Sequence, residues 1–388
     1  MAKKVVITLP VLFTGGTEIQ TISLVKVLVT AGYDVAVLCF YDFEQKMVAA
    51  MEKTGARVVL LKLDRDGGLW LLLKSLTKFF RKERFYFCHV QYMAPGFIPV
   101  VAARLAGVPV VFATVHQPGH PYGKKAHYLL RIAAQLCTRF ICISKSVESS
   151  WFKNSELFDV QAQKIQSRHC TIFNAVDVNA IAVASDVSMK YETRRQYHLG
   201  DERTIGCVAR LRVEKGQKIL IQAFSEVVKV IPDIKLLMIG DGPDKLELML
   251  LAEELSVTES IIWLGRQDQA DVYRLYGVMD VVVVPSLFEG FGLAAAEAMS
   301  AGVPVIASNI DGLAEVVRDS ETGVLFPVGN SQALAASLIQ LLNSPSLSAQ
   351  FGKNGQVRVR DFFAIESFSE SMLALYGHYL PTQNGAHK

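Results

Sequence analysis

Two carboxylates eight positions apart, Glu289 and Glu297, lie on either side of a glycine-bearing segment. An apolar run ends at Pro285, a loop with Gly290 and Gly292 follows, and an alanine-rich helical pattern carries Glu297. Glycines let backbone N–H groups approach a ligand closely, and a helix N-terminus favours an anion. A carboxylate accepts hydrogen bonds from sugar or ribose hydroxyls at about 1.5–3 kcal/mol each. The combination predicts a binding site, although either carboxylate alone also fits a local ion pair or a surface loop.

Two cations five positions apart, Arg210 and Lys215, follow the apolar run 204–208 in a loop that ends at Gly216. A loop at a strand end can turn both cations inward, where they neutralise a diphosphate and stabilise it as a leaving group. A solvated charged loop is the alternative interpretation. We identify no D-x-D carboxylate pair near a strand end that would hold a nucleotide-bound metal ion, so we expect a reaction that needs none.

Short apolar runs alternate with helical patterns through the first half, as expected for parallel strands covered on both faces. The predicted strands are 4–9, 34–39, 57–62, 87–91, 108–115 and 139–143. Helical patterns separate them, such as 17–31, which Gly32 ends. This alternation predicts an α/β doubly wound domain over residues 1–176.

A second alternation follows a polar connection at 177–203. Its predicted strands are 204–209, 235–240, 261–265, 280–285 and 303–308. We therefore expect a second doubly wound domain over 204–361, and a closing helix at 362–380 that packs back on the first domain. Two such domains place ligands at the carboxyl ends of their strands, facing each other across a cleft. The predicted fold class is α/β with two Rossmann-like domains.

The second half resembles family 4 of the retaining glycosyltransferases, which have the GT-B fold. The resemblance rests on the E-x7-E pair Glu289/Glu297, the R-x4-K pair Arg210/Lys215, and further matches at 239–243, 264–265, 302–308, 312–315 and 322–323. Residues 174–177 read Asn-Ala-Val-Asp where the family has Asn-Gly-Val-Asp, which puts only a hinge in doubt. The family implies transfer of a sugar from a nucleotide-sugar donor with retention of the anomeric configuration.

The resemblance implies a role for each matching residue. Arg210 and Lys215 would bind the donor diphosphate, and Glu297 would hold the ribose hydroxyls. Glu289 and the backbone that follows it would contact the sugar and phosphate, and a cation after the third strand would lie near the base. The rest of the implied donor-binding set is Gly240, Arg266, Glu289, Phe291, Gly292 and Leu293.

The first half matches the family more loosely. Gly15 and Gly16 resemble the glycine loop after the first strand, which approaches the donor phosphate and the acceptor. Thr17 and Gln20 also form a capping-box pattern, in which Thr17 only starts a helix. His116 matches a family histidine that touches the donor sugar, whereas a lone histidine at a strand end is otherwise structural.

The implied mechanism is a front-face reaction in which the leaving diphosphate helps to deprotonate the acceptor hydroxyl. Glu289 would position the sugar, Arg210 and Lys215 would stabilise the leaving group, and His116 would orient the sugar, without a covalent intermediate. The nucleotide sugar is a co-substrate, and no further cofactor is expected. A nucleotide-sugar epimerase or phosphorylase and a non-catalytic GT-B protein that binds a nucleotide or partner are the alternatives. A dehydrogenase is disfavoured because G-x-G-x-x-G does not follow the first strand.

The charge divides unevenly along the chain. Residues 1–180 contain 22 Lys and Arg against 12 Asp and Glu, whereas 181–388 contain 18 against 25. Within the basic half, residues 69–85 combine Trp70, Phe79 and Phe80 with five cations, as in a helix that lies on an anionic membrane surface. A core helix with a solvated basic end fits nearly as well. We expect a glycan or lipid-linked acceptor in polysaccharide or glycolipid assembly, and no nucleic acid.

The composition is that of a globular chain, with 51% hydrophobic and 20% charged residues among 388. The start resembles a secretion signal, but Thr14-Gly15-Gly16-Thr17-Glu18 replaces a small-residue cleavage site, so a first strand is predicted instead. The six cysteines are scattered in apolar stretches and are expected in the core. We therefore predict a cytoplasmic protein that associates peripherally with the inner face of the membrane if residues 69–85 bind it.

Overall fold

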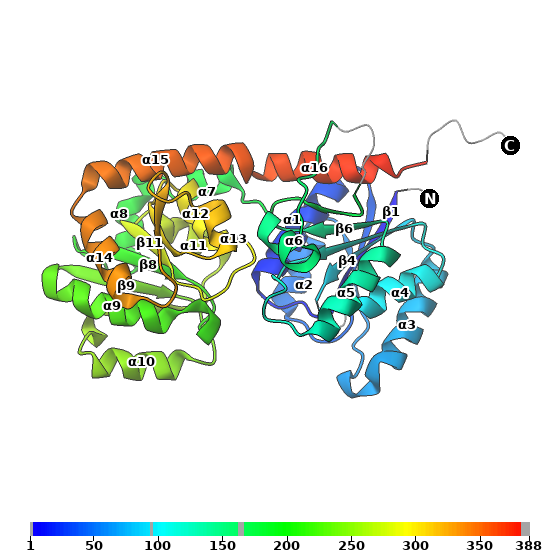
Figure 1. The fold of residues 1–388 in the computed structure, drawn as a ribbon, viewed down its shortest axis with the longest axis horizontal. Coiled ribbons are helices and arrows are strands. Elements are labelled where there is room, and N and C mark those ends of the chain that lie inside the picture. The colour runs from blue at the N-terminus through cyan, green and yellow to red at the C-terminus, as the bar shows by residue number, and fades with distance from the viewer. Residues whose placement is uncertain (1–2, 94–95, 162–166, 382–388) are drawn as a thin grey trace. The chain divides into compact units, whose positions relative to one another are not determined.

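The computed structural model describes residues 3–93, 96–161 and 167–381. The chain divides into two compact units, each with its own sheet (Figure 1). Unit 1 comprises Met1–Asn174 and Glu366–Lys388, and unit 2 comprises Ala175–Ile365. Residues 177–203, predicted as a connection, form two helices that belong to unit 2.

Unit 1 is built on a seven-stranded parallel sheet in the order β3-β2-β1-β4-β5-β6-β7. The strands are β1 (Lys4–Leu9), β2 (Asp34–Cys39), β3 (Arg57–Leu60), β4 (Phe87–Tyr92), β5 (Val110–Val115), β6 (Arg139–Cys142) and β7 (His169–Thr171). The six strands predicted in this half are confirmed, while β7, a three-residue strand at the edge of the sheet, was missed. The predicted strand 57–62 ends two residues early, because Lys62 adopts a left-handed conformation with φ +50°.

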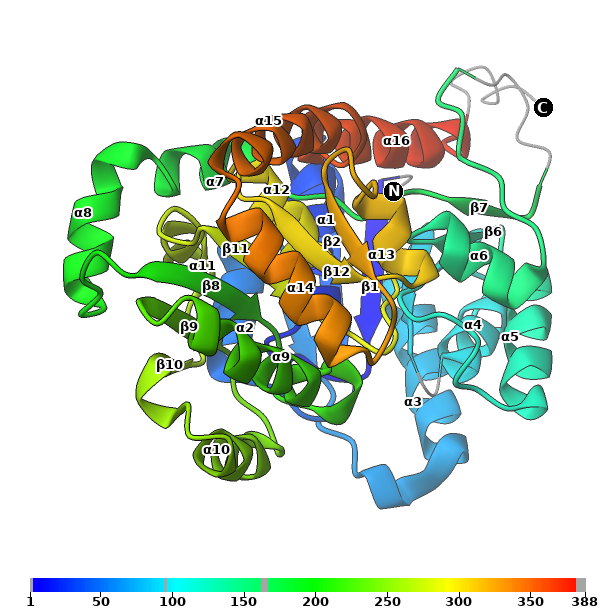
Figure 2. The ribbon, with the colours of Figure 1, turned by 60° about the vertical axis from the view of Figure 1, so that its left-hand side comes forward.

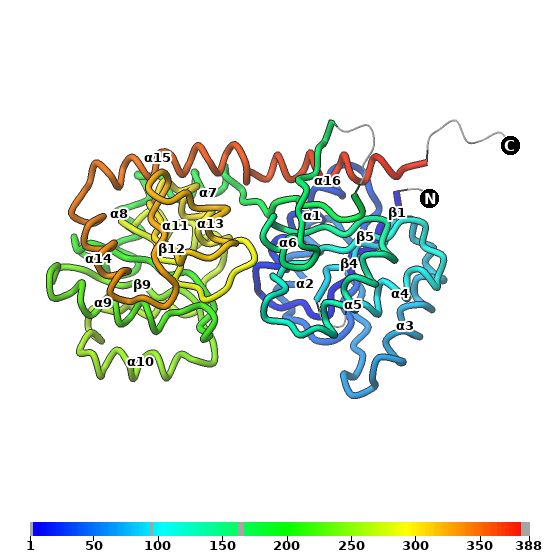
Figure 3. The backbone as a smooth tube through the Cα atoms, viewed as in Figure 1, coloured from blue at the N-terminus to red at the C-terminus, as the bar shows by residue number. Residues whose placement is uncertain are grey.

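The helices of unit 1 cover its sheet, and α3, α4 and α5 pack side by side (Figure 1). They are α1 (Gly16–Thr30), α2 (Gln45–Glu52), α3 (Gly68–Glu83), α4 (Phe97–Leu105), α5 (Lys124–Leu136), α6 (Lys145–Phe152) and α16 (Ile365–His378), with a short turn η1 (Arg65–Gly67). The chain returns to this unit at its end as α16 (Figure 3). On this helix Tyr376 is buried against Phe87 and Phe112, at ring distances of 5.0 and 5.1 Å.

Unit 2 has a six-stranded parallel sheet in the order β10-β9-β8-β11-β12-β13. The strands are β8 (Arg203–Val208), β9 (Ile234–Ile239), β10 (Ile261–Gly265), β11 (Val281–Val284), β12 (Val305–Ser308) and β13 (Gly323–Phe326). The five strands predicted in this half are confirmed, and the edge strand β13 was missed. In β11 all four valines are buried, as a strand covered on both faces requires.

The helices of unit 2 include a closely packed pair, α9 and α14 (Figure 2), whose buried side chains share one core with β8, β9, β11 and β12. They are α7 (Val178–Ala184), α8 (Val187–Gln196), α9 (Gln217–Val230), α10 (Lys245–Glu254), α11 (Gln269–Tyr276), α12 (Leu293–Ser300), α13 (Asp311–Val316), α14 (Ser331–Leu342) and α15 (Pro345–Phe362), with short turns η2 (Val213–Lys215) and η3 (Thr258–Ser260). Both units are therefore doubly wound α/β domains, as predicted.

Candidate functional site

The strand order of unit 2 contains a point where the direction of chain winding reverses. β9 and β10 extend the sheet on one side of β8, whereas β11, β12 and β13 extend it on the other. The connections after β8 and β11 consequently leave in opposite directions, and the crevice between them is the usual ligand position in such a sheet. The segment with Arg210 and Lys215 follows β8, and the segment with Glu289 and Glu297 follows β11.

The loop after β8 is held against the loop after β11. Gly216 has φ +68°, and a Cβ on it would lie 2.0 Å from the carbonyl oxygen of Pro285. The Leu287 N–H donates to the Glu214 carbonyl at 2.9 Å. This close approach places Lys215, in η2, next to the segment that carries Glu289.

Lys215 and Glu289 form an ion pair, with Nζ and Oε2 2.6 Å apart. Their side chains are 26% and 21% exposed, so the pair is accessible to a ligand from solvent. Arg210 precedes them on the same loop and is exposed, while its carbonyl accepts from the Gln217 amide at 3.0 Å. The two cations predicted to bind a diphosphate thus lie on one loop, and one of them directly contacts a predicted sugar-binding carboxylate.

The segment after Glu289 brings backbone amides to the start of α12. Gly292 precedes the helix with φ +99°, a conformation that favours glycine, and Leu293 is the first helical residue. Phe291 is 1% exposed and packs edge-on against Phe363 at 5.2 Å, so it anchors the loop to the core. The helix N-terminus at Leu293 therefore opens at the carboxyl edge of the sheet, where it favours an anion.

Glu297 lies one turn into α12 and is partly buried. The Tyr276 hydroxyl, at the end of α11, donates to its Oε2 at 2.9 Å. Burial raises the pKa of Glu297 to about 7, while the hydrogen bond from Tyr276 opposes that rise. Sequence reasoning missed Tyr276, and only its position at the end of a helix after β10 could have suggested it.

Gly240 and Arg266 follow β9 and β10. Gly240 has φ +135°, and a Cβ there would lie 1.9 Å from the Ala209 carbonyl oxygen, so glycine is required for this loop to pack on the loop after β8. Its N–H donates to the Gly265 carbonyl at 2.8 Å. Arg266 is exposed at the same edge of the sheet. The packing of this loop therefore explains why residue 240 is a glycine.

Unit 1 has its own reversal of winding, between β1 and β4. Gly15 and Gly16 follow β1, and Gly15 is the N-cap of α1. Thr17 lies inside that helix, so the capping-box interpretation of Thr17 was wrong. Glu18, which sequence reasoning did not consider for the site, is 7% exposed, and its carboxylate folds back on Gly15. Burial raises its pKa to about 7.

His116 directly follows β5. Its Nε2 lies 2.7 Å from the Oε1 of Gln91, which is on the neighbouring strand β4. Burial lowers the pKa of His116 to about 4, so the imidazole is neutral at physiological pH. Because an amide oxygen only accepts, Nε2 is the donor in this contact, and the neutral ring leaves Nδ1 to accept one hydrogen bond without adding charge.

Comparison with known proteins identifies the family. Residues 14–177 match the family model described as Glycosyltransferase Family 4, and residues 189–358 match the model described as Glycosyl transferases group 1. The chain belongs to the family 4 glycosyltransferases. This glycosyltransferase is 28% identical over 344 residues to the capsular polysaccharide biosynthesis glycosyltransferase CapM of Staphylococcus aureus. The matched region covers 84% of this chain and 86% of the relative.

A second relative is the UDP-Gal:alpha-D-GlcNAc-diphosphoundecaprenol alpha-1,3-galactosyltransferase of Escherichia coli. It is 28% identical over 316 residues, or 78% of each chain. Among solved structures, Anabaena HepE in complex with UDP-glucose matches 96% of this chain and 99% of its own, with a TM-score of 0.82 and 21% identity. That likeness shows the GT-B fold.

The remaining expectations concern metal binding, the burial of the cysteines and helices that could span a membrane. Among the residues that the structure describes, no group of three His, Cys, Asp or Glu side chains could hold a metal ion. The one D-x-D sequence, at 64–66, forms the short turn η1, where Asp64 accepts from the Asp66 N–H at 2.9 Å. All six cysteines are buried, as predicted. Within the described parts of the chain, no helix is both long and apolar enough to cross a membrane.

Proposed function

We propose that this glycosyltransferase is a retaining enzyme that needs no metal ion, binds a nucleotide-diphosphate sugar in unit 2, and transfers the sugar to a glycan or lipid-linked acceptor. The observation that carries the proposal is the direct contact between Lys215 and Glu289 at the reversal point of the second sheet. A cation suited to phosphate and a carboxylate suited to sugar hydroxyls lie side by side there, as a nucleotide sugar requires.

Each residue of this site has a distinct task in the proposed reaction. Arg210 and Lys215 neutralise the diphosphate, the start of α12 donates backbone hydrogen bonds to it, and Glu289 accepts from the sugar hydroxyls. Glu297, fixed by Tyr276, accepts from the ribose hydroxyls. The bond between the anomeric carbon and the diphosphate breaks while the acceptor oxygen bonds to the same face, and the acceptor proton passes to the leaving diphosphate.

The relatives' names support a proposal for the donor and for the acceptor. The Escherichia coli relative is named for UDP-Gal and a diphosphoundecaprenol-linked acceptor, and HepE was crystallised with UDP-glucose. A uridine nucleotide is therefore our first proposal for the donor, and a lipid-linked glycan for the acceptor.

Metal independence rests on the two cations of the β8 loop, which supply positive charge where a metal ion would otherwise act.

A thermal-shift panel with UDP, GDP and ADP tests the donor site. One nucleotide should raise the melting temperature, because a ligand at about 100 times its Kd stabilises the native state by about 2.7 kcal/mol. Glu297→Ala should abolish this shift, whereas Glu253→Ala, on the exposed face of α10, should retain it. A panel in which no nucleotide shifts the wild type would reject the proposed activity and favour a non-catalytic protein.

Stereochemistry and metal use need separate measurements once a donor is known. The anomeric configuration of the product, read by NMR, should match that of the donor sugar. Activity should persist in excess EDTA. Inversion at the anomeric carbon, a glycosyl adduct on any of these side chains, or full loss of activity in EDTA would each contradict the corresponding part of the proposal.

A further inference from the structure

A concave site lies in unit 1, at the carboxyl ends of β2 and β3. It has a volume of about 340 Å³ and is lined by Tyr41, Asp42, Phe43, Lys62 and Leu63. This volume is at the lower end of the range of roughly 300–1,000 Å³ that small-molecule sites occupy. The site therefore suits one compact ligand rather than a long stretch of polymer.

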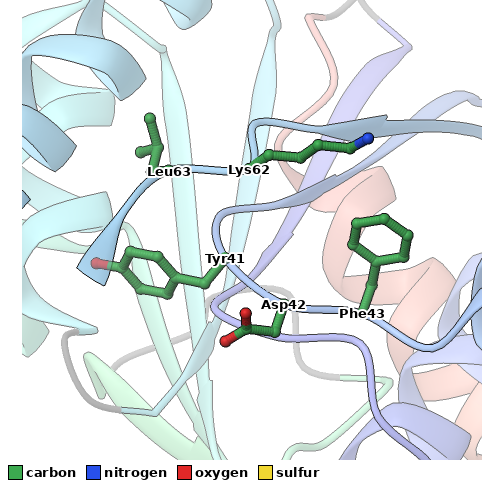
Figure 4. A pocket seen from close by; sticks show the side chains of 5 residues that line it. All are labelled: Tyr41, Asp42, Phe43, Lys62 and Leu63. Atoms are coloured by element: carbon green, nitrogen blue, oxygen red, sulfur yellow. The ribbon is translucent and has the colours of Figure 1, made fainter. Parts of the chain in front are cut away.

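The lining side chains form two walls, as Figure 4 shows. Tyr41 and Leu63 lie on one side, Phe43 and Lys62 on the other, and the Asp42 carboxylate is between them. Apolar ring faces are thus combined with one carboxylate and one ammonium group. A pyranose ring has the matching chemistry, because its C–H face is apolar while its edge is a ring of hydroxyls that donate and accept hydrogen bonds.

Charge contacts hold this arrangement in place. Arg65 donates from Nε to the Asp42 Oδ2 at 2.8 Å, and its guanidinium lies 5.2 Å from the centre of the Tyr41 ring. The Lys62 ammonium lies 5.5 Å from the centre of the Phe43 ring. These contacts orient the aromatic rings before any ligand arrives, which reduces the cost of binding.

Lys62 has an unusual backbone for a residue with a side chain. Its φ is +50°. The residues on either side are held by hydrogen bonds, because the N–H groups of Leu61 and Leu63 donate to the carbonyls of Cys39 and Phe40, both at 2.9 Å. The hydrogen bonds on either side thus fix the turn that places Lys62 at the site. Such conformations outside glycine cluster at functional sites, where the surrounding structure maintains them.

The pocket is connected to the glycine loop after β1. The Leu12 N–H donates to the Asp42 carbonyl at 3.0 Å, and the Glu44 N–H donates to the Leu12 carbonyl at 2.8 Å. The Thr14 hydroxyl also donates to the Glu44 carboxylate at 2.7 Å. These bonds join the segment that lines the pocket to the segment that leads into Gly15, so the two segments are fixed to each other.

From these features we infer that the Tyr41–Lys62 pocket is a subsite for a pyranose ring of the acceptor. The inference rests on the proposed function, since only a glycosyltransferase that extends a glycan needs such a subsite. The diphosphate-binding cations belong to unit 2, whereas this pocket offers aromatic faces and a carboxylate. Its lining also continues through η1 into α3, whose first turn exposes Leu69 and Trp70 at 57% and 75%. A sugar on a lipid carrier can thus be held close to a surface that suits a membrane.

Saturation-transfer NMR on the full chain tests the subsite with methyl glycosides of glucose, galactose, mannose, N-acetylglucosamine and glucuronic acid. At least one glycoside should receive saturation. Its affinity should fall on the order of fivefold to tenfold in Tyr41→Ala and in Phe43→Ala, the effect of losing one favourable contact. Lys62→Gly should weaken binding as well, and because glycine tolerates φ +50°, this variant is not expected to misfold. Tyr191→Ala, at an exposed position of unit 2, is the matched control and should bind as wild type does.

The result that overturns the subsite is distinct from the result that overturns the donor site. The subsite is rejected if no glycoside receives saturation, if binding survives Tyr41→Ala and Phe43→Ala, or if UDP displaces the glycoside from the pocket. The nucleotide thermal shift, measured on the same samples, decides the donor site independently. A nucleotide shift without glycoside binding rejects only the subsite. Glycoside binding without a nucleotide shift rejects the proposed activity, and with it the role of this sugar-binding pocket as an acceptor subsite.

Discussion

At the scale of single residues, Glu297 combines two conditions that rarely coexist in an apolar helix. It is partly buried, which raises its pKa to about 7, and it accepts a hydrogen bond from Tyr276 that favours its ionised form. Ribose hydroxyls would add further donors to the same carboxylate. Ligand binding should therefore favour the ionised form and couple nucleotide affinity to pH near neutrality.

The pH dependence of nucleotide binding tests this coupling. If the ionised carboxylate binds ribose, nucleotide affinity should rise about tenfold between pH 6 and pH 8, because a group with a pKa near 7 goes from mostly protonated to mostly ionised. Calorimetry on Glu297→Gln should give a nearly flat profile of nucleotide affinity against pH. Any slope that remains in this variant is the contribution of the nucleotide's own phosphate. Glu18→Gln is the control for the other carboxyl of pKa about 7, and should keep the wild-type dependence.

The same shift predicts how Glu297 affects stability. Its pKa in the folded state, about 7, lies above its ordinary value of 4.5, so between these values the native state binds more protons than the unfolded state. The unfolding free energy should consequently fall as pH rises through this window. Denaturant unfolding of Glu297→Gln at several pH values should show a smaller fall than the wild type does.

The Lys215–Glu289 pair predicts a division between binding and turnover. Glu289→Gln removes the anionic partner of Lys215, so UDP should bind up to about fivefold more tightly, the scale of a partly exposed ion pair. Transfer should nonetheless fall by about 100-fold or more, because the sugar loses a charged hydrogen-bond acceptor. Calorimetric Kd and steady-state kcat/KM measure the two effects. Lys215→Ala is the comparison, and should weaken UDP binding; equal loss of binding in both variants would contradict the assigned roles.

Part of this site was predictable from the sequence and part was not. Strand-end loops of a parallel sheet meet at one edge, so the cations at 210–215 and the carboxylates at 289–297 could be placed together in advance. Their direct contact depends on the register that pairs Val281 with Ile205 and on the packing of Gly216 against Pro285. Neither is visible in a pattern of residue types.

At the scale of elements, Gly216 fixes the distance between the two loops of the donor site. Gly216→Ala should destabilise unit 2 by on the order of 1–3 kcal/mol, because the methyl group would strike the Pro285 carbonyl and alanine disfavours φ +68°. Gly329→Ala is a matched control, since its φ is +78° but no atom lies within 4 Å of the added Cβ. Thermal unfolding should show the larger loss for Gly216→Ala, and equal losses would mean that backbone conformation alone matters.

The exposed first turn of α3 predicts binding to an anionic membrane. Leu69, Trp70 and Leu71 are 57%, 75% and 39% exposed, while the basic end of the helix carries Arg81 and Lys82. The chain should co-sediment with vesicles of phosphatidylcholine and phosphatidylglycerol, and less with phosphatidylcholine alone. Trp70→Ser should reduce binding severalfold, whereas Tyr191→Ala should not. Equal binding to neutral and anionic vesicles, or none to either, would contradict this prediction.

The elements that were missed share a physical cause. β7 and β13 are edge strands of three and four residues, and β13 lacks the fully buried run that marks the equally short strands β11 and β12. Their pairing with β6 and β12 is a tertiary effect that short apolar runs do not reveal. The long central strands, by contrast, are continuous apolar runs, and the sequence was sufficient to place them.

At the scale of the whole molecule, the two units have separate cores, and the chain's end contributes to the first. Tyr376, on α16, is fully buried and its hydroxyl lies 2.8 Å from the Nδ1 of His89, while the His89 Nε2 lies 2.7 Å from the Thr114 hydroxyl. Both ring nitrogens of the buried His89 therefore have hydrogen-bond partners. Unit 1 therefore depends on a segment that is nearly 300 residues away in sequence from His89.

This dependence predicts that one substitution destabilises one unit only. Tyr376→Ala should cost about 3–5 kcal/mol by opening a cavity beside Phe87 and Phe112, which lowers the melting temperature of unit 1 by roughly 6–20 °C. Tyr376→Phe should cost less, about 1–3 kcal/mol, because only the hydrogen bond to His89 is lost. The nucleotide-induced shift of unit 2 should survive in both variants, since the donor site shares no side chain with this core. Differential scanning calorimetry with and without UDP separates the two effects, and loss of the nucleotide shift in Tyr376→Ala would mean that the stabilities of the two units are coupled.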